Sequence, residues 1–228
     1  MIYIARIHNN YTEKFGIPRQ SGLVGNSLSK IVFEPEFRNP DALRGLEGFS
    51  RIWLIWEFSE AVRRGKEAGI TEWSPTVRPP RLGGNERMGV FATRSPFRPN
   101  PIGLSCVEIE EIRLKTDEGP VILVKGADLM NGTPIFDIKP YIPYADAFPD
   151  ALGGFTDENV FEKAEVTFAP QAEGILTTQE EEELKEVLRQ DPRPAYKRNI
   201  GKTYRFTFAG REVAFEACGG EIRVTEIQ

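Results

Sequence analysis

The sequence predicts a mainly β protein, with a small β-barrel over residues 1–150 and a smaller α+β domain over residues 159–228. Two observations favour the barrel. The first part of the chain holds at least five strand-like segments bounded by turn residues, and it holds little helical periodicity. Since open strand edges invite aggregation, closure of so many strands into a barrel is expected. The stretch 146–158 contains Pro149 and the pair Gly153-Gly154 without periodicity, and we expect the domain boundary there.

Taken in order, the barrel elements are short apolar runs. Asn39 and Pro40 predict an N-cap and first position of a short helix between two of them. The run 51–58 is apolar without interruption, which predicts a strand buried on both faces, and 61–68 predicts a helical turn. The expected strands lie at 1–8, 29–33, 51–58, 104–112 and 120–125.

The C-terminal segment carries a different pattern. A strand is expected at 164–168, and Thr178 with Glu181 predicts a capping box at the start of a helix. Leu184, Val187 and Leu188 would form the buried stripe of that helix. Alternating strands follow at 202–208, 212–217 and 221–227, and turns containing glycine join them.

Composition excludes several enzyme classes. The chain has 228 residues, a net charge of −5, one histidine and two cysteines, so zinc chemistry and Ser/His or Cys/His hydrolysis are not expected. We expect no metal. Neither a membrane span nor a signal peptide is evident, which predicts a cytoplasmic protein with no membrane partner. Glycine patterns of dinucleotide and P-loop sites are also missing.

The stretch Gly89–Gly103 is the most unusual segment. Three prolines stiffen it, and each residue before a proline is pushed away from helical geometry. It presents Arg94 and Arg98, and the range 78–98 holds five arginines against one acid, a local charge of +4. Guanidinium groups bind phosphate or carboxylate bidentately, so a preorganised anion site is predicted. A rigid turn with solvated arginines is the alternative for this loop alone.

A second group of polar residues follows the turn Asn131-Gly132. In an extended chain Asp137, Lys139 and Tyr141 project to one face, where a carboxylate, an ammonium and a phenol would line one surface. A polar strand face that is only solvated fits the same spacing.

Four motifs, in fixed order over almost the whole chain, resemble those of the TsaA-like family and its bacterial two-domain TrmO branch. They are Gly48-Phe-Ser-Arg-Ile-Trp-Leu-Ile-Trp, Thr93-Arg-Ser-Pro-Phe-Arg-Pro-Asn-Pro-Ile-Gly, the segment Gly126–Tyr141, and Asp191-Pro-Arg-Pro-Ala-Tyr. The resemblance implies a dimeric tRNA methyltransferase with a small barrel that binds S-adenosylmethionine. It implies methylation of N6 of threonylcarbamoyl-adenosine just 3′ of the anticodon.

The resemblance also implies roles for individual residues. Asp137, Lys139 and Tyr141 become candidates for orienting the acceptor nitrogen or taking its proton. Arg98 and the motif residues Asp191, Arg193 and Tyr196 are expected to contact tRNA, with Arg193 on phosphate and Tyr196 stacked on a base. The expected cofactor pocket is formed by Arg19, Gln20, Phe58, Ser59, Arg94, Leu104, Asp128, Asn131, Gly132 and Thr133.

Two other classes of function fit parts of this pattern. A module that senses S-adenosylmethionine without methyl transfer would need the pocket but not the second rigid loop with Arg193 and Tyr196. An accessory protein that only binds RNA is disfavoured by the net charge of −5 and by the absence of a stacking-sheet motif.

Overall fold

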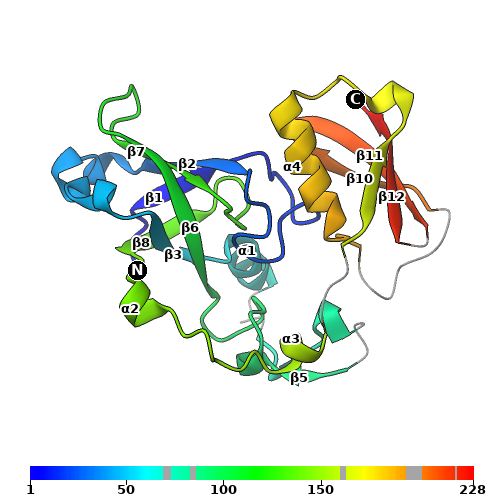
Figure 1. Cartoon of the computed structure of the whole chain (residues 1–228). Helices are drawn as coiled ribbons and strands as arrows, with labels where there is room; N and C mark the ends of the chain where they lie inside the picture. Colours follow the sequence, from blue (N-terminus) through cyan, green and yellow to red (C-terminus); the bar gives the residue numbers. More distant parts are fainter. Residues whose placement is uncertain (69–72, 83–85, 160–162, 194–201, 219) are drawn as a thin grey trace.

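The computed structural model describes residues 1–228 except 69–72, 83–85, 160–162, 194–201 and 219. A closed barrel occupies the N-terminal part, and a separate sheet covered by one long helix stands beside it (Figure 1). The barrel order is β1-β2-β7-β6-β3-β8, and each neighbouring pair is antiparallel. Its strands are β1 (Ala5–His8), β2 (Leu28–Phe33), β3 (Arg51–Glu57), β6 (Ile102–Arg113), β7 (Val121–Lys125) and β8 (Pro134–Pro140). The prediction of a mainly β chain with a barrel is therefore confirmed.

Burial along β3 corrects one expectation. Ile52, Leu54 and Trp56 point into the barrel and are buried, whereas the residues between them are only half-buried. The prediction of a strand buried on both faces was wrong, because a closed barrel has a single interior and its outer wall here is only partly covered. Inside, β3 packs against apolar residues of every other barrel strand, including Ile7, Ile31 and Val107.

Helical segments of the N-terminal part lie outside the barrel. The predicted helical turn at 61–68 is longer, because the helix begins directly after β3. Asn39 caps a short 3₁₀ turn by accepting a hydrogen bond from the Asp41 amide at 3.0 Å, which agrees with its predicted role. The helices are α1 (Ser59–Ala68), α2 (Pro143–Asp146) and α3 (Phe155–Glu158); the 3₁₀ turns are Pro35–Phe37, Pro40–Leu43, Leu46–Gly48, Pro80–Leu82 and Val90–Ala92. A small ribbon pairs β4 (Thr76–Val77) with β5 (Met88–Gly89).

The C-terminal domain is a sheet of order β10-β11-β12-β9 with α4 on the side that faces the barrel (Figure 1). Leu184, Val187 and Leu188 are buried, as predicted. The capping box, however, is formed by Thr177 and Glu180, one residue before the predicted pair, because Thr177 is the residue with extended backbone and its hydroxyl accepts from the Glu180 amide. The elements are β9 (Glu165–Phe168), α4 (Thr178–Arg189), β10 (Tyr204–Phe208), β11 (Arg211–Cys218) and β12 (Glu221–Ile227), with a 3₁₀ turn at Pro170–Ala172.

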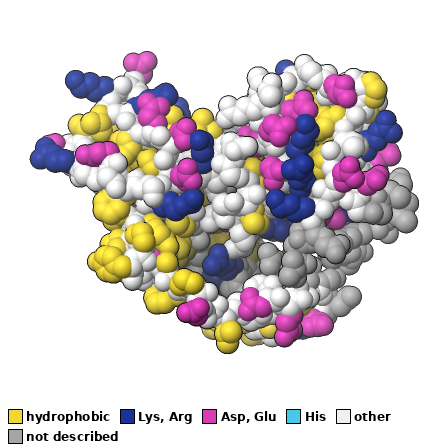
Figure 2. Space-filling model, in the orientation of Figure 1, with side chains coloured by type: hydrophobic (Ala, Val, Ile, Leu, Met, Phe, Trp, Pro, Cys, Tyr) yellow, Lys and Arg dark blue, Asp and Glu magenta, His cyan; other side chains and the backbone are white. Residues whose placement is uncertain are grey.

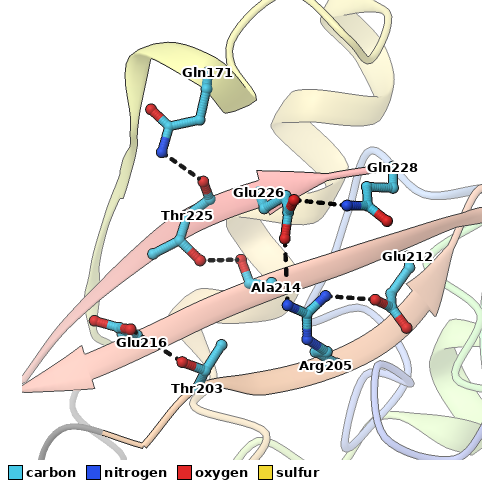
Figure 3. Close-up of polar contacts among 9 residues, drawn as sticks. All are labelled: Gln171, Thr203, Arg205, Glu212, Ala214, Glu216, Thr225, Glu226 and Gln228. Atoms are coloured by element: carbon cyan, nitrogen blue, oxygen red, sulfur yellow. Dashed lines mark hydrogen bonds and ion pairs between the residues drawn. The ribbon is translucent and has the colours of Figure 1, made fainter.

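The outer face of this sheet is polar and balanced in charge. Figure 3 shows Arg205 of β10 between Glu212 of β11 and Glu226 of β12, with Arg205 Nη1 2.5 Å from the Glu212 carboxylate. Thr203 donates to Glu216 on the same surface at 3.0 Å. Paired charges of both signs do not make the basic surface that nucleic acid requires.

A strap, which we define as residues 9–24 between β1 and β2, joins the two domains. Phe15 of the strap stacks on Tyr204 and Phe215, with ring centroids 6.3 and 6.1 Å apart. Tyr11 and Val24 are buried in the core of the C-terminal domain rather than in the barrel core. The strap therefore completes the second domain. In the described part of the chain, no helix is long and apolar enough to cross a membrane.

Candidate functional site

A cavity of about 920 Å³ lies where β3 runs into α1 and where β6 begins. The strap forms a further wall, the segment 94–98 forms another, and Pro192 contributes from the C-terminal domain. Figure 2 shows the surface hollowed below the barrel and beside the C-terminal domain, with basic side chains visible in the hollow. The cavity has the size and the partly apolar wall of a site for a cofactor-sized molecule.

The stretch Gly89–Gly103 shapes one wall through hydroxyl turns as well as prolines. The Thr93 hydroxyl donates to the Val90 carbonyl at 2.9 Å and accepts from the Ser95 amide at 3.3 Å. The Ser95 hydroxyl accepts in turn from the Phe97 amide at 3.2 Å. These local bonds fix the backbone without a regular ladder, which is why a loop so rich in prolines is ordered.

The far end of this stretch is bonded to the end of β3. The Phe58 amide donates to the Pro101 carbonyl at 2.9 Å, and Phe58 lies against Trp56 with ring centroids 4.4 Å apart. Two segments distant in sequence thus meet at the cavity. Arg94 and Arg98 line it, and Arg98 donates to the Thr93 carbonyl at 3.3 Å.

Charges in the cavity wall are mixed. Four basic and four acidic side chains line it, together with several aromatic rings. Guanidinium groups suit a carboxylate, whereas carboxylates and ring faces suit a cationic centre. This donor set fits a zwitterionic ligand with an aromatic base, which describes S-adenosylmethionine. The charged residues are Lys14, Arg19, Arg94 and Arg98 with Glu13, Glu57, Glu60 and Asp128.

A buried relay orients Asp128. The Trp56 indole donates to the Ser105 hydroxyl at 2.9 Å, and Ser105 donates to Asp128 at 2.5 Å. Desolvation raises the pKa of the Asp128 carboxyl, although the Ser105 hydrogen bond and the Arg94 charge act in the opposite direction. Asp128 is consequently held in one orientation at the cavity and keeps its proton to a higher pH than an exposed aspartate.

Arg94 and Gln20 connect opposite walls. Arg94 Nη1 donates to the Gln20 side-chain oxygen at 2.5 Å, and Gln20 Nε2 donates to the Arg19 carbonyl at 2.6 Å. The proline loop is thereby joined to the strap. The sequence indicated both segments, but it gave no sign that they touch.

Most of the predicted cofactor residues are brought together. Asn131 and Gly132 are not in the cavity wall; Gly132 has φ +80°, and its carbonyl accepts from Arg6 at 3.2 Å. Asn131 accepts from the Asn9 amide at 3.1 Å, so this turn holds the strap rather than the cavity. The predicted residues that line the cavity are Arg19, Gln20, Phe58, Ser59, Arg94, Leu104, Asp128 and Thr133, and Arg98 from the tRNA set.

The three candidates for acceptor chemistry lie elsewhere. Asp137 and Lys139 share one face of β8, as predicted, and form an ion pair of 3.2 Å. Both side chains are about half exposed, and neither they nor Tyr141 line the cavity. Tyr141 packs on Trp53, with ring centroids 5.9 Å apart, and Trp53 does line the cavity. The group therefore sits one side chain away from the site.

The C-terminal motif reaches the cavity through Pro192. Asp191, with φ +43°, turns the chain after α4 and accepts from Arg193 Nε at 2.7 Å and from Arg193 Nη2 at 2.9 Å. Arg193 is 6% exposed and lies over the Tyr204 ring, so its guanidinium is built into the turn. Tyr196 falls outside the described residues.

Sequence reasoning missed several wall residues. Trp56, Gly103 and Glu57 line the cavity, and the Tyr3 hydroxyl donates to Glu57 at 2.7 Å. In the sequence, Trp56 looks like an ordinary core residue. The sequence signal for its position lies in Gly103, which is paired with it across β3 and β6, because a glycine within a strand indicates that another group approaches the backbone closely. Among the residues that the structure describes, no group of three or more His, Cys, Asp or Glu is placed to hold a metal ion.

The fold and the cavity together describe a two-domain protein whose candidate ligand site is built on a closed barrel rather than on a parallel sheet. Two family models match: the tRNA-methyltransferase O N-terminal domain over residues 6–147, and the TrmO C-terminal domain over residues 162–228. The chain belongs to the TrmO family of tRNA methyltransferases.

Individual relatives agree with this assignment. The tRNA (adenine(37)-N6)-methyltransferase of Escherichia coli (strain K12) is 45% identical over 210 residues, which cover 88% of this chain and 86% of the relative. The enzyme of that name from Eikenella corrodens is 44% identical over 168 residues, 73% of this chain and 90% of the relative. A crystal structure of TrmO from Pseudomonas aeruginosa superposes with a TM-score of 0.77 at 31% identity, covering 99% of this chain and 96% of that one.

Proposed function

We propose that this methyltransferase transfers the methyl group of S-adenosylmethionine to N6 of the adenine 3′ to a tRNA anticodon, with threonylcarbamoyl-adenosine as the acceptor. The observation that carries the proposal is the mixed-charge, aromatic cavity in a chain of this family. Arg94 would hold the cofactor carboxylate, and Asp128, fixed by Ser105, would face a cationic part of the cofactor.

The cofactor supplies an activated methyl group on a sulfonium, so the protein mainly has to place donor and acceptor in line. The acceptor nitrogen attacks the methyl carbon, the carbon–sulfur bond breaks with its electrons left on sulfur, and the N–H proton leaves to water or a weak base. The threonylcarbamoyl group places a carbonyl beside N6, which makes this proton more acidic than in plain adenine. No strong base is therefore required of the chain.

In this proposal the reaction at the cavity does not involve the side chains of Asp137, Lys139 and Tyr141, which do not line it. Because this group lies on the outer barrel wall behind Trp53, it would orient the anticodon loop at the rim. Arg98, in the cavity wall, is suited to a phosphate of the same loop.

We also propose a homodimer. The segment after β8 exposes Tyr144, Phe148 and Leu152 by 91%, 73% and 94%, and the N-terminal Met1 and Ile2 are equally open. Figure 2 shows hydrophobic side chains gathered on the face that carries α2 and the N-terminus. Patches of this kind mark interfaces between chains. Light scattering on the wild type and on Phe148→Ser tests it, and a wild-type monomer at micromolar concentration would refute it.

The function is tested by incubating the protein with labelled S-adenosylmethionine and two tRNA samples that differ only in the threonylcarbamoyl group. Label is expected in the modified tRNA alone, at N6 of the adenine 3′ to the anticodon, as located by mass spectrometry of anticodon-loop fragments. Cofactor binding by calorimetry without transfer to either tRNA would favour the sensor instead. Transfer to both samples would contradict the acceptor.

A further inference from the structure

We propose that Arg19 is a positioning residue that clamps the Asp191–Arg193 turn against the cavity of its own chain, so that cavity and turn act within one subunit. Arg19 Nη2 donates to the carbonyls of Asp191 at 2.9 Å and Arg193 at 3.4 Å. Its backbone amide donates to the Gln190 side chain at 3.3 Å. The proposal rests on the proposed function for its kinetic test but not for its structural one.

The clamp acts at the cavity wall. Arg19 and Pro192 both line the cavity, and Pro192 is the residue between the two carbonyls that Arg19 holds. A guanidinium is a planar fork of fixed geometry, so gripping both carbonyls fixes the orientation of the peptide units around Pro192. The position of one strap side chain thus decides where the C-terminal motif meets the cavity.

The Asp191–Arg193 turn is held together by its own hydrogen bonds. Asp191 and Arg193 are both buried and form a bidentate ion pair, and the Arg193 amide also donates to the Asp191 carboxylate at 3.3 Å. Since this pair is internal to the turn, it sets the shape of the turn but not its place on the barrel. The position of the turn relative to the barrel depends on hydrogen bonds between the strap and the C-terminal domain. At the cavity, Arg19 makes two such bonds, to the carbonyls of Asp191 and Arg193.

The strap explains why the arrangement is intramolecular. Glu13 accepts a hydrogen bond from the Thr207 amide of β10, and a Cβ on Gly16 would come within 2.7 Å of the Phe206 ring. The strap therefore contacts the C-terminal domain at Glu13 and again at Gly16, six and three residues before Arg19. Arg19 reaches the turn of its own chain because its neighbours in sequence are already packed in that domain.

The structural test is hydrogen exchange in the full-length protein. Arg19→Ala is expected to speed exchange at least tenfold in peptides covering the turn, and Arg19→Lys, which still offers donors to the carbonyls, to restore part of the protection. Asn10→Ala is the matched control, because it removes another interdomain hydrogen bond, 3.3 Å from Asn10 to Glu183. Unchanged exchange at the turn, or equal loss in Asn10→Ala, would overturn the clamp.

The kinetic test separates placement from cofactor binding. A displacement of about 1 Å at a reacting site lowers rates about a hundredfold, so kcat with tRNA, measured at saturating cofactor, should fall by that order in Arg19→Ala and should be partly restored in Arg19→Lys. A loss of cofactor affinity equal to that of Arg94→Ala would instead make Arg19 a cofactor anchor and refute the assignment. If the wild type transfers no methyl group, the proposed function fails, and the exchange experiment still decides on the clamp.

Use of the turn within one chain is tested by co-expressing two differently tagged chains, one carrying Arg94→Ala and the other Arg193→Ala, and purifying on both tags. Each mixed dimer then has one intact cavity and one intact turn on different chains. No recovered methyl transfer, or no complex carrying both tags, supports the proposal; recovered transfer overturns it. Because Arg193 is buried, Pro192→Gly serves as a second turn variant in the same experiment.

Discussion

Gly103→Ala is the change with the clearest structural cost at the cavity. Gly103 lies opposite Trp56 in the β3–β6 pair, and an added Cβ would come within 2.2 Å of the indole ring. Overpacking of a core costs about 1–3 kcal/mol, and displacement of Trp56 also breaks its hydrogen bond to Ser105, worth about 1 kcal/mol. We expect a loss of about 2–4 kcal/mol, which for a protein of this size lowers Tm by roughly 4–16 °C.

Thermal unfolding followed by near-ultraviolet circular dichroism measures this effect, since the signal reports tryptophan packing. Gly89→Ala is the matched control, because its φ of −57° suits any residue and no atom lies within 4 Å of the added Cβ. Replacing Trp56 by Leu in the Gly103→Ala background should cost less than the sum of the single changes. A Tm loss for Gly103→Ala no larger than that for Gly89→Ala would refute the close contact.

Three further predictions concern the cap, a buried acid and the cofactor site. Thr177→Ala should destabilise the protein by about 1 kcal/mol in urea unfolding, because Thr177 caps α4. Thr178→Ala should not, because Thr178 takes no part in the capping bond. Equal losses in the two variants would contradict the assignment of the cap to Thr177. Glu183 is 2% exposed, and desolvation raises the pKa of its carboxyl in the folded protein. The folded protein therefore loses stability as the pH rises above about 4.5, the pKa of this carboxyl in the unfolded chain. Glu183→Gln should therefore gain stability over the wild type from pH 4 to pH 7, and a difference independent of pH would contradict this. Arg94→Ala should weaken cofactor binding about tenfold in calorimetry, the loss of one charge-assisted contact, and an unchanged Kd would remove Arg94 from the site.

Residue patterns predicted the strands and helices well, because the spacing of apolar residues, the turn residues and the helix caps all act within a few residues of the element that they determine. The apolar run at 51–58 located β3, and the proline loop around Arg94 located a cavity wall. Burial on both faces of β3 was predicted wrongly, because an apolar run does not reveal whether both of its faces are covered. The shift from Thr178 to Thr177 arose because both threonines can cap, and only the backbone decides.

Contacts between distant segments were out of reach. The bond from Arg19 to the Asp191 carbonyl joins residues 172 positions apart, and nothing in either segment encodes the other. Likewise, the spacing of Asp137 and Lys139 correctly placed them on one strand face, but spacing cannot say whether that face looks into a cavity or away from it. The register of β8 against β3 decides that, and register is a property of the pair.

The strap has a consequence for the order of events during synthesis. The last barrel strand, β8, ends at residue 140. The Phe15 ring, however, is covered by Tyr204 and Phe215, which are synthesised later. The Phe15 ring, which is made before all barrel strands except β1, therefore stays uncovered until the segment 204–215, made after them, has left the ribosome. Pairings so far apart in sequence form slowly. A chain cut short after the barrel would expose the Phe15 ring permanently, which makes truncated products prone to aggregate.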